Sequence, residues 1–198
     1  MGARVIEAIV IGGSAGALEA LMRILPALPA SFPIPVAIVL HVLAGKPTHL
    51  AEVLGAKCAM PVKEPEDKEP IAAATVYVAP SNYHLLVERT RHFSLSVDEP
   101  VNFSRPSIDV LFESAADAYR SALAGVVLAG SNDDGAKGLA RIKEAGGIAI
   151  VQSPETAPSR EMPDAALRRT IVDHVLPLDA IGPLLTGIAG ARTAREDA

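Results

Sequence analysis

The chain has 198 residues, of which 49% are hydrophobic and 21% charged, a balance that excludes a disordered protein. A net charge of -5 and an aromatic content of 4%, without Trp, argue against a nucleic-acid binder. No apolar stretch approaches the ~20 residues of a membrane span, and the one cysteine, Cys58, is expected to be a buried apolar residue in a reducing cytoplasm.

The chain opens with a pattern typical of a parallel sheet. Residues 6–11 form an apolar run ending in glycines, residues 17–28 carry Leu and Met at helical spacing, and residues 36–41 form a second apolar run. A short helix is predicted at residues 50–54. Strand, helix and strand joined by short links predict a βαβ unit.

The middle of the chain alternates more strongly between apolar and polar residues. Residues 75–79, 84–88 and 93–97 are joined by polar turns and predict antiparallel strands in a hairpin at a sheet edge. The charged, proline-bearing residues 63–70 predict a surface loop.

In the second half of the chain, apolar runs again alternate with segments of helical spacing. The remaining predicted elements are a helix at 108–123, a strand at 125–129, a helix at 136–145, a strand at 148–152, an irregular loop at 154–163, and helices at 165–169 and 181–188. We therefore predict one α/β domain over residues 5–188, followed by a polar C-terminal tail at 189–198. Its fold class would be a doubly wound, mostly parallel sheet with helices on both faces and an antiparallel hairpin at one edge.

A glycine-rich segment with one serine follows the first predicted strand. Residues 12–16, Gly-Gly-Ser-Ala-Gly, fit G-x-S-x-G, in which small neighbours let Ser14 occupy a sharp strand-to-helix turn with an exposed hydroxyl. The N–H groups of the following helix can stabilise an oxyanion there. The segment alone leaves a nucleophile, a phosphate-binding turn and a plain helix cap open.

A histidine and two aspartates follow other predicted strands. His41 closes the second apolar run, where it can act as a general base or simply bond to the backbone. Asp133 and Asp134 follow the strand at 125–129, where either can cap the next helix or orient an imidazole. Because ligands bind beyond the carboxyl ends of parallel strands, these groups are predicted to share one crevice, as nucleophile, base and orienting acid do in acyl transfer.

Two other families that use similar motifs fit less well. The dinucleotide fingerprint G-x-G-x-x-G expects an acidic residue ~20 positions further on, whereas no Asp or Glu occurs between Glu19 and Glu52. The α/β-hydrolase superfamily orders its triad Ser, acid, His. Here the order is Ser, His, Asp, and only one strand precedes the serine.

Several further segments in a fixed order point to one family. They are Ile-Gly-Gly-Ser-Ala-Gly at 11–16, Leu-His at 40–41, Val-Tyr-Val-Ala-Pro at 76–80 with His84, Pro-Ser-Ile-Asp-Val-Leu-Phe at 106–112, Asp-Gly-Ala-Lys-Gly at 134–138, and Met-Pro at 162–163. With them, the sequence from about residue 5 to about residue 185 resembles the catalytic domain of the CheB family of chemotaxis protein-glutamate methylesterases.

The resemblance implies an activity and a set of residues. The family hydrolyses γ-glutamyl methyl esters on chemoreceptors and can deamidate glutamines there. Its triad maps onto Ser14, His41 and Asp134, the last chosen because it directly precedes Gly135. Its backbone oxyanion donors map onto Ala15 and Ser131, and its substrate-binding methionine onto Met162; no cofactor or metal is implied.

The sequence departs from the family pattern at four places. Ser-Thr-Gly-Gly becomes Ser-Ala-Gly-Ala at 14–17, the Gln before the histidine becomes Leu40, Gly-Met-Gly before the acid becomes Gly-Ser-Asn at 130–132, and Gly-Met-Pro becomes Glu-Met-Pro at 161–163. These changes concern the oxyanion and acyl-recognition loops. The family commonly carries an N-terminal receiver domain, whereas this chain starts only a few residues before its first predicted strand, so we expect no fused receiver.

The leading hypothesis is a serine hydrolase, a protein-glutamate methylesterase in chemotaxis signalling. Its expected partners are a methyl-accepting chemoreceptor or similar methylated protein and a separate receiver-domain protein, without nucleic acid or a membrane span. Two alternatives remain: a signalling or binding module of the same fold without full activity, and an esterase for a small metabolite.

Overall fold

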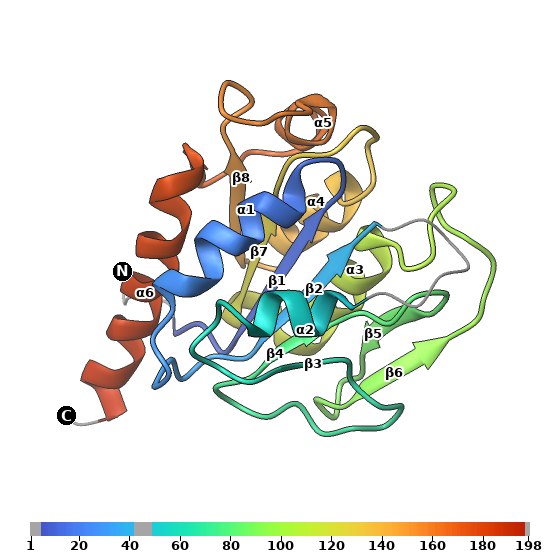
Figure 1. The fold of residues 1–198 in the computed structure, drawn as a ribbon. Helices are drawn as coiled ribbons and strands as arrows, with labels where there is room; N and C mark the ends of the chain where they lie inside the picture. Colours follow the sequence, from blue (N-terminus) through green and yellow to red (C-terminus); the bar gives the residue numbers. More distant parts are fainter. Residues whose placement is uncertain (1–4, 42–48, 197–198) are drawn as a thin grey trace.

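The computed structural model describes residues 5–41 and 49–196, which form three layers with a parallel sheet in the middle (Figure 1). The seven strands lie in the order β3-β4-β2-β1-β7-β8-β9, and every neighbouring pair is parallel. Their bounds are β1 Ala8–Gly13, β2 Val36–Leu40, β3 Val62–Lys63, β4 Val76–Val78, β7 Leu123–Val127, β8 Ile148–Gln152 and β9 His174–Leu176.

The central strands are apolar throughout because both sheet faces are covered. All residues of β1, β2 and β7 are buried, as expected for parallel strands between two helical layers. The strand order reverses around β1, since β2 lies on one side of it and β7 on the other. In such sheets, ligands bind beyond the carboxyl ends of the strands at this switch point.

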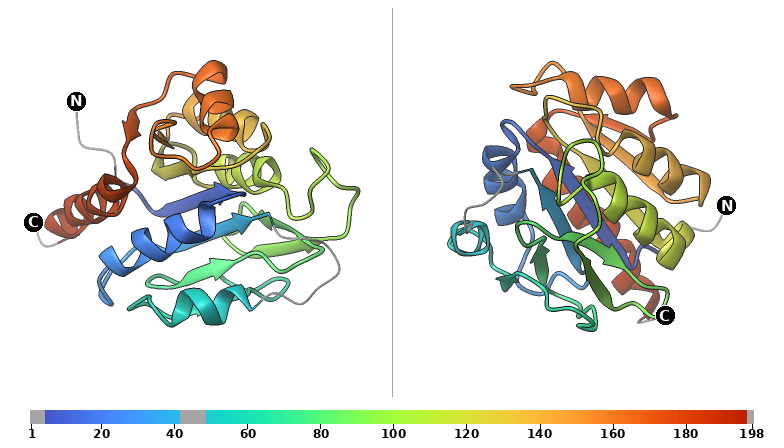
Figure 2. Two further views of the ribbon diagram at one scale, coloured as in Figure 1. Left: turned by 45° about the horizontal axis from the view of Figure 1, so that its top comes forward. Right: turned by 90° about the vertical axis from the view of Figure 1, so that its right-hand side faces the viewer.

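The helices form two layers, one on each face of the sheet (Figure 2), and each layer packs against the sheet through its own hydrophobic cluster. Helices α1 (Ala17–Ile24), α2 (Leu50–Gly55) and α6 (Leu178–Glu196) contribute to one cluster, and α3 (Ile108–Tyr119), α4 (Ala136–Glu144) and α5 (Glu161–Arg169) to the other. Short 3₁₀ turns, η1 (Leu25–Ala27) and η2 (Arg120–Ala122), follow α1 and α3. Alternate residues of β1 supply both clusters: Ile9 and Ile11 face the first, and Ala8 and Val10 the second.

The predicted doubly wound sheet is confirmed, but the middle of the chain differs in part from the prediction. Residues 75–79, expected in an antiparallel hairpin, contribute β4, which pairs in parallel with β2. The hairpin itself is β5 (His84–Val87) with β6 (Phe93–Ser96), a separate two-stranded sheet. It packs on α3. A three-residue strand is too short for its alternation to distinguish parallel from antiparallel pairing.

The C-terminal helix is longer than the sequence predicts. Helix α6 begins at Leu178 and continues to Glu196, through Pro183 and past residue 188, where the domain was expected to give way to a tail. The domain boundary itself stays a prediction. Within the described ranges, no helix combines the length and apolar character needed to cross a bilayer.

Candidate active site

Ser14 and His41 lie side by side at the carboxyl end of the sheet. Gly13 of β1 pairs with Leu40 of β2, and the His41 N–H donates to the Gly13 carbonyl at 3.0 Å. Ser14 and His41 are each one residue beyond that pair. Because adjacent strands are about 4.8 Å apart, the two side chains leave the sheet from neighbouring positions.

The glycines of the serine segment are required by close packing. A Cβ at Gly12 would lie 2.2 Å from Ile108 Cγ2, at the start of α3, and one at Gly13 would lie 2.4 Å from the Ala17 Cβ in α1. Gly16 has φ of +85°, in the left-handed region that glycine adopts without strain. The turn therefore brings the beginnings of two helices against the end of β1.

Asp134 is bound to His41 and is completely buried. Its Oδ2 lies 2.8 Å from His41 Nε2, and its side chain has 0% exposure. Asn102 Nδ2 and Ser107 Oγ both donate to Oδ1 at 2.9 Å. The preference for Asp134 over its neighbour agrees with this geometry, since Asp133 is exposed.

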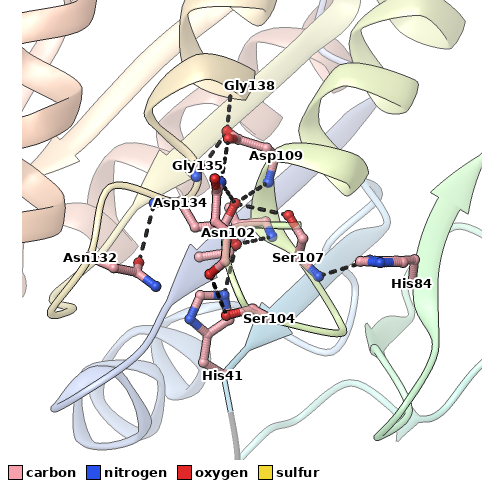
Figure 3. Close-up of polar contacts among 11 residues, drawn as sticks. His41, His84, Asn102, Ser104, Ser107, Asp109, Asn132, Asp134, Gly135 and Gly138 are labelled. Atoms are coloured by element: carbon pink, nitrogen blue, oxygen red, sulfur yellow. Dashed lines mark hydrogen bonds and ion pairs between the residues drawn. The ribbon is translucent and has the colours of Figure 1, made fainter. Parts of the chain in front are cut away.

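The main chain of α3 supplies two further donors to Asp134 (Figure 3). The Ile108 N–H donates to Oδ2 at 2.7 Å and the Asp109 N–H to Oδ1 at 3.0 Å. These are among the first N–H groups of the helix, which have no partner within it. Asp134, which is not part of α3, thus caps the start of this helix.

Helices α3 and α4 cap each other, because the carboxylate that accepts from the first N–H groups of one helix lies at the start of the other. Asp109, in the first turn of α3, accepts hydrogen bonds at Oδ1 from the N–H groups of Gly135 (2.9 Å) and Gly138 (2.7 Å) at the start of α4. Asp134, just before α4, does the same for α3. The Asn102 amide lies between the two carboxylates and donates 3.0 Å to Asp109 Oδ2 as well as to Asp134. The two helix starts and the loop are therefore joined at one point.

The two carboxyl groups have opposite pKa shifts. Burial alone would raise the pKa of Asp134, but hydrogen bonds from His41, Asn102 and the Ile108 N–H outweigh it and lower the pKa. Burial raises the pKa of Asp109 above its usual value, despite the bond from Gly138, and the charge of Asp134 adds to this. The lowered pKa favours the ionised form of Asp134, whose Oδ2 accepts a hydrogen bond from His41 Nε2–H. Nδ1 of His41 is left as the basic atom.

A cavity of about 630 Å³ opens over these groups. The residues that line it are Ser14, Ala15, His41, Asn102, Phe103, Ser104, Asn132 and Asp133. Of the predicted oxyanion donors, Ala15 lies in this lining. Ser131 immediately precedes two lining residues, and its Oγ pairs with Ser159 Oγ at 3.0 Å.

Met162, predicted from the resemblance to bind substrate, lies outside the cavity lining. Its side chain is completely buried, and a Cβ at Gly130 would lie 2.5 Å from its Cε. Its N–H donates to the Gly130 carbonyl at 3.0 Å. Met162 therefore supports the loop that contains Ser131 from beneath.

Three polar residues of this network were not assigned a role from the sequence. Ser107 and Asp109 belong to a sequence pattern typical of a helix start. Nothing in that pattern shows that Asp134 caps the helix. Asn102 comes from the loop between β6 and α3 and carries no sequence signal of its contacts. Among residues 5–41 and 49–196 there is no group of three His, Cys, Asp or Glu side chains that could hold a metal ion.

Comparisons with known proteins agree with the earlier resemblance. The family described as CheB methylesterase matches residues 9–185. A putative protein-glutamate methylesterase/protein-glutamine glutaminase of Leptospira interrogans is 52% identical over 178 residues, covering 90% of this chain and 92% of that protein. A protein-glutamate methylesterase/protein-glutamine glutaminase of Trichodesmium erythraeum is 37% identical over 89% of this chain, which spans 51% of it.

A solved structure supports the same assignment. The crystal structure of the Thermotoga maritima CheB methylesterase catalytic domain superposes with a TM-score of 0.88 and 33% identity, covering 92% of this chain and 98% of that domain. On these grounds, the chain belongs to the CheB methylesterase family.

Proposed function

We propose that this protein is a serine hydrolase that removes methyl groups from glutamate γ-methyl esters of a chemoreceptor or similarly methylated protein. The observation that carries the proposal is the 2.8 Å contact between His41 Nε2 and the buried Asp134, beside Ser14 in one open cavity. The names of the relatives in Leptospira and Trichodesmium support both the esterase and a glutaminase activity on the same substrate. Both reactions are acyl transfers to water.

The reaction proceeds in two steps. Ser14 Oγ attacks the ester carbonyl while His41 Nδ1 takes the hydroxyl proton, and Asp134 stabilises the resulting imidazolium through Nε2–H. The tetrahedral intermediate expels methoxide, which receives that proton from His41 and leaves as methanol. Water, activated by the same imidazole, then releases the carboxylic acid and restores Ser14. For a glutamine substrate the leaving group is ammonia.

The oxyanion is stabilised by main-chain N–H groups on two sides. One is that of Ala15, at the start of the turn before α1, and the other belongs to the loop at Ser131. Met162 under Gly130 holds this second loop in place, so its contribution to the site is indirect. No cofactor takes part in any step.

Membership of the CheB methylesterase family supports a setting for this activity. We propose that the protein acts in the cytoplasm and that a separate receiver-domain protein regulates access to the cavity. The second part can be tested by adding phosphorylated receiver domains to the assay and measuring the rate of methanol release.

The variant Ser14→Ala tests the mechanism. Turnover of a methylated chemoreceptor, measured as methanol release, is expected to fall about 10⁵-fold or more, as in other triad serine knockouts. Ser31→Ala is the matched control, because Ser31 is exposed and precedes β2 at the opposite end of the sheet. A fluorophosphonate probe should label Ser14 in the wild type. Near-wild-type turnover by Ser14→Ala would refute the role of Ser14 as nucleophile. A wild type that the probe does not label would favour a binding module.

A further inference from the structure

The loop between β6 and α3 contains a tight turn with an unusual residue at its tip. Val101 and Ser104 exchange two main-chain hydrogen bonds, of 3.1 and 2.9 Å, so that Asn102 and Phe103 form a two-residue hairpin turn. Both have positive φ, 50° and 60° respectively. Such turns favour Asn followed by Gly, because both residues must adopt the left-handed region. Asn fits this preference, whereas a phenylalanine there is strained.

The phenylalanine is also fully exposed. Phe103 has a relative exposure of 104%, and Val97 and Val101 in the same loop are exposed at 66% and 37%. The fold gains no apolar burial from Phe103 to offset its backbone strain. Strain of this kind clusters at functional positions, and an exposed aromatic side chain at a site often marks contact with a ligand.

The exposure does not arise from a loosely held loop. The Arg105 guanidinium donates to the carbonyls of Val97 and Asp98, at 2.8 and 3.0 Å. His84 accepts the Ser107 N–H at Nδ1, so its Nε2–H donates to the Glu99 carbonyl at 3.1 Å. The loop is held at several points along its length, although Figure 1 shows it projecting beyond the end of β6.

The two residues of the turn have different surroundings. Asn102 donates to Asp109 and Asp134 beneath the cavity, which holds the turn against the network that orients His41. The Phe103 side chain is exposed and contributes to the rim of the cavity that contains Ser14. A cavity of about 630 Å³ exceeds what one methyl-ester side chain occupies. Residues flanking the ester in a protein substrate can therefore reach this rim.

We propose that Phe103 is a specificity-determining residue, which contacts an apolar side chain beside the esterified glutamate in the protein substrate. The inference rests on the proposed function and names the part of the substrate that a free ester lacks. A small ester occupies only the end of the cavity at Ser14 and His41. The protein substrate also covers Phe103, and that contact favours proteins over small esters.

The test is a comparison of two substrates across two variants. The measured quantity is the ratio of kcat/KM for a methylated chemoreceptor to kcat/KM for a blocked glutamate γ-methyl ester without flanking residues. Phe103→Gly should lower this ratio about tenfold or more, the effect expected for losing an aromatic contact residue. Its urea midpoint should rise, because glycine relieves the left-handed strain. Phe103→Leu, which retains an apolar side chain, should recover most of the ratio.

Ile171→Gly is the matched control. Ile171 is 81% exposed and precedes β9 at the opposite end of the sheet from the cavity, so its loss should leave the ratio unchanged. An unchanged ratio in Phe103→Gly, or an equal loss on both substrates, would overturn the specificity role while leaving the esterase intact. A wild type that cleaves neither substrate would instead remove the proposed function, and this inference with it.

Discussion

Replacing Asp134 by Asn separates the charge of the orienting group from its shape. Five donors converge on the carboxylate, three on Oδ1 and two on Oδ2. An amide has one oxygen, so its NH₂ group must face either the Ile108 N–H or the Asp109 N–H. One buried N–H then loses its acceptor, which costs about 1–3 kcal/mol. Losing a negative charge at the start of α3 adds about 0.5–1 kcal/mol, so the expected loss of stability is about 1.5–4 kcal/mol.

The same change should reduce turnover far more than stability. If the amide NH₂ faces His41, Nε2 must accept, and the hydrogen moves to Nδ1, the atom that should take the serine proton. A histidine held in the wrong tautomer costs about 10⁴-fold in kcat in a serine protease. We expect a similar loss here in methanol release from a methylated chemoreceptor. Urea unfolding of the same sample gives the free energy of unfolding.

The adjacent aspartate is the control for this variant. Asp133 is exposed, so Asp133→Asn should change the unfolding free energy by no more than about 0.5 kcal/mol and should keep kcat within about tenfold. If Asp134→Asn kept kcat within tenfold of the wild type while remaining folded, the assignment of the histidine tautomer would be wrong.

Three more predictions follow from the same contacts. The wild type should be more stable than Asp134→Asn above the ordinary aspartate pKa of about 4. This advantage should vanish as pH falls through the lowered pKa that Asp134 has in the folded protein, and urea midpoints measured across pH would show it. Gly12→Ala should lose about 1–3 kcal/mol in urea unfolding, because its Cβ would collide with Ile108; wild-type stability would contradict the packing argument. His84→Leu leaves the Ser107 N–H without its acceptor. It should lose about 1–3 kcal/mol by thermal or urea unfolding, and an unaffected midpoint would count against that bond.

The positions of Ser14 and His41 could be predicted because they depend on local patterns. Each follows a continuous apolar run, and such runs identify buried parallel strands whose carboxyl ends meet. The structure places them one residue beyond a registered pair of β1 and β2. The orienting acid was harder to predict, because Asp133 and Asp134 are adjacent and spacing alone does not distinguish them. Only the resemblance separated them, and the burial of Asp134 is consistent with that choice.

The remaining contacts depend on tertiary structure that no local pattern encodes. Asn102 reaches Asp134 across 32 positions of sequence, through a turn whose Asn-Phe pair lacks the usual Asn-Gly signature. The strands β3 and β9 contain two and three residues, too few for periodicity to register. Helix α5 begins at Glu161, four residues before the predicted start, because proline is tolerated in a first turn.

The exchanged caps of α3 and α4 bear on how such a domain can change over evolutionary time. A descendant that abandoned hydrolysis could replace Ser14 at little structural cost, because its side chain only has to face an open cavity. Asp134 is different, since the start of a helix depends on it whether or not any reaction takes place. An inactive member of this architecture should therefore keep the acid and lose the alcohol. A surviving aspartate in a relative is then poor grounds for inferring that it still turns over substrate.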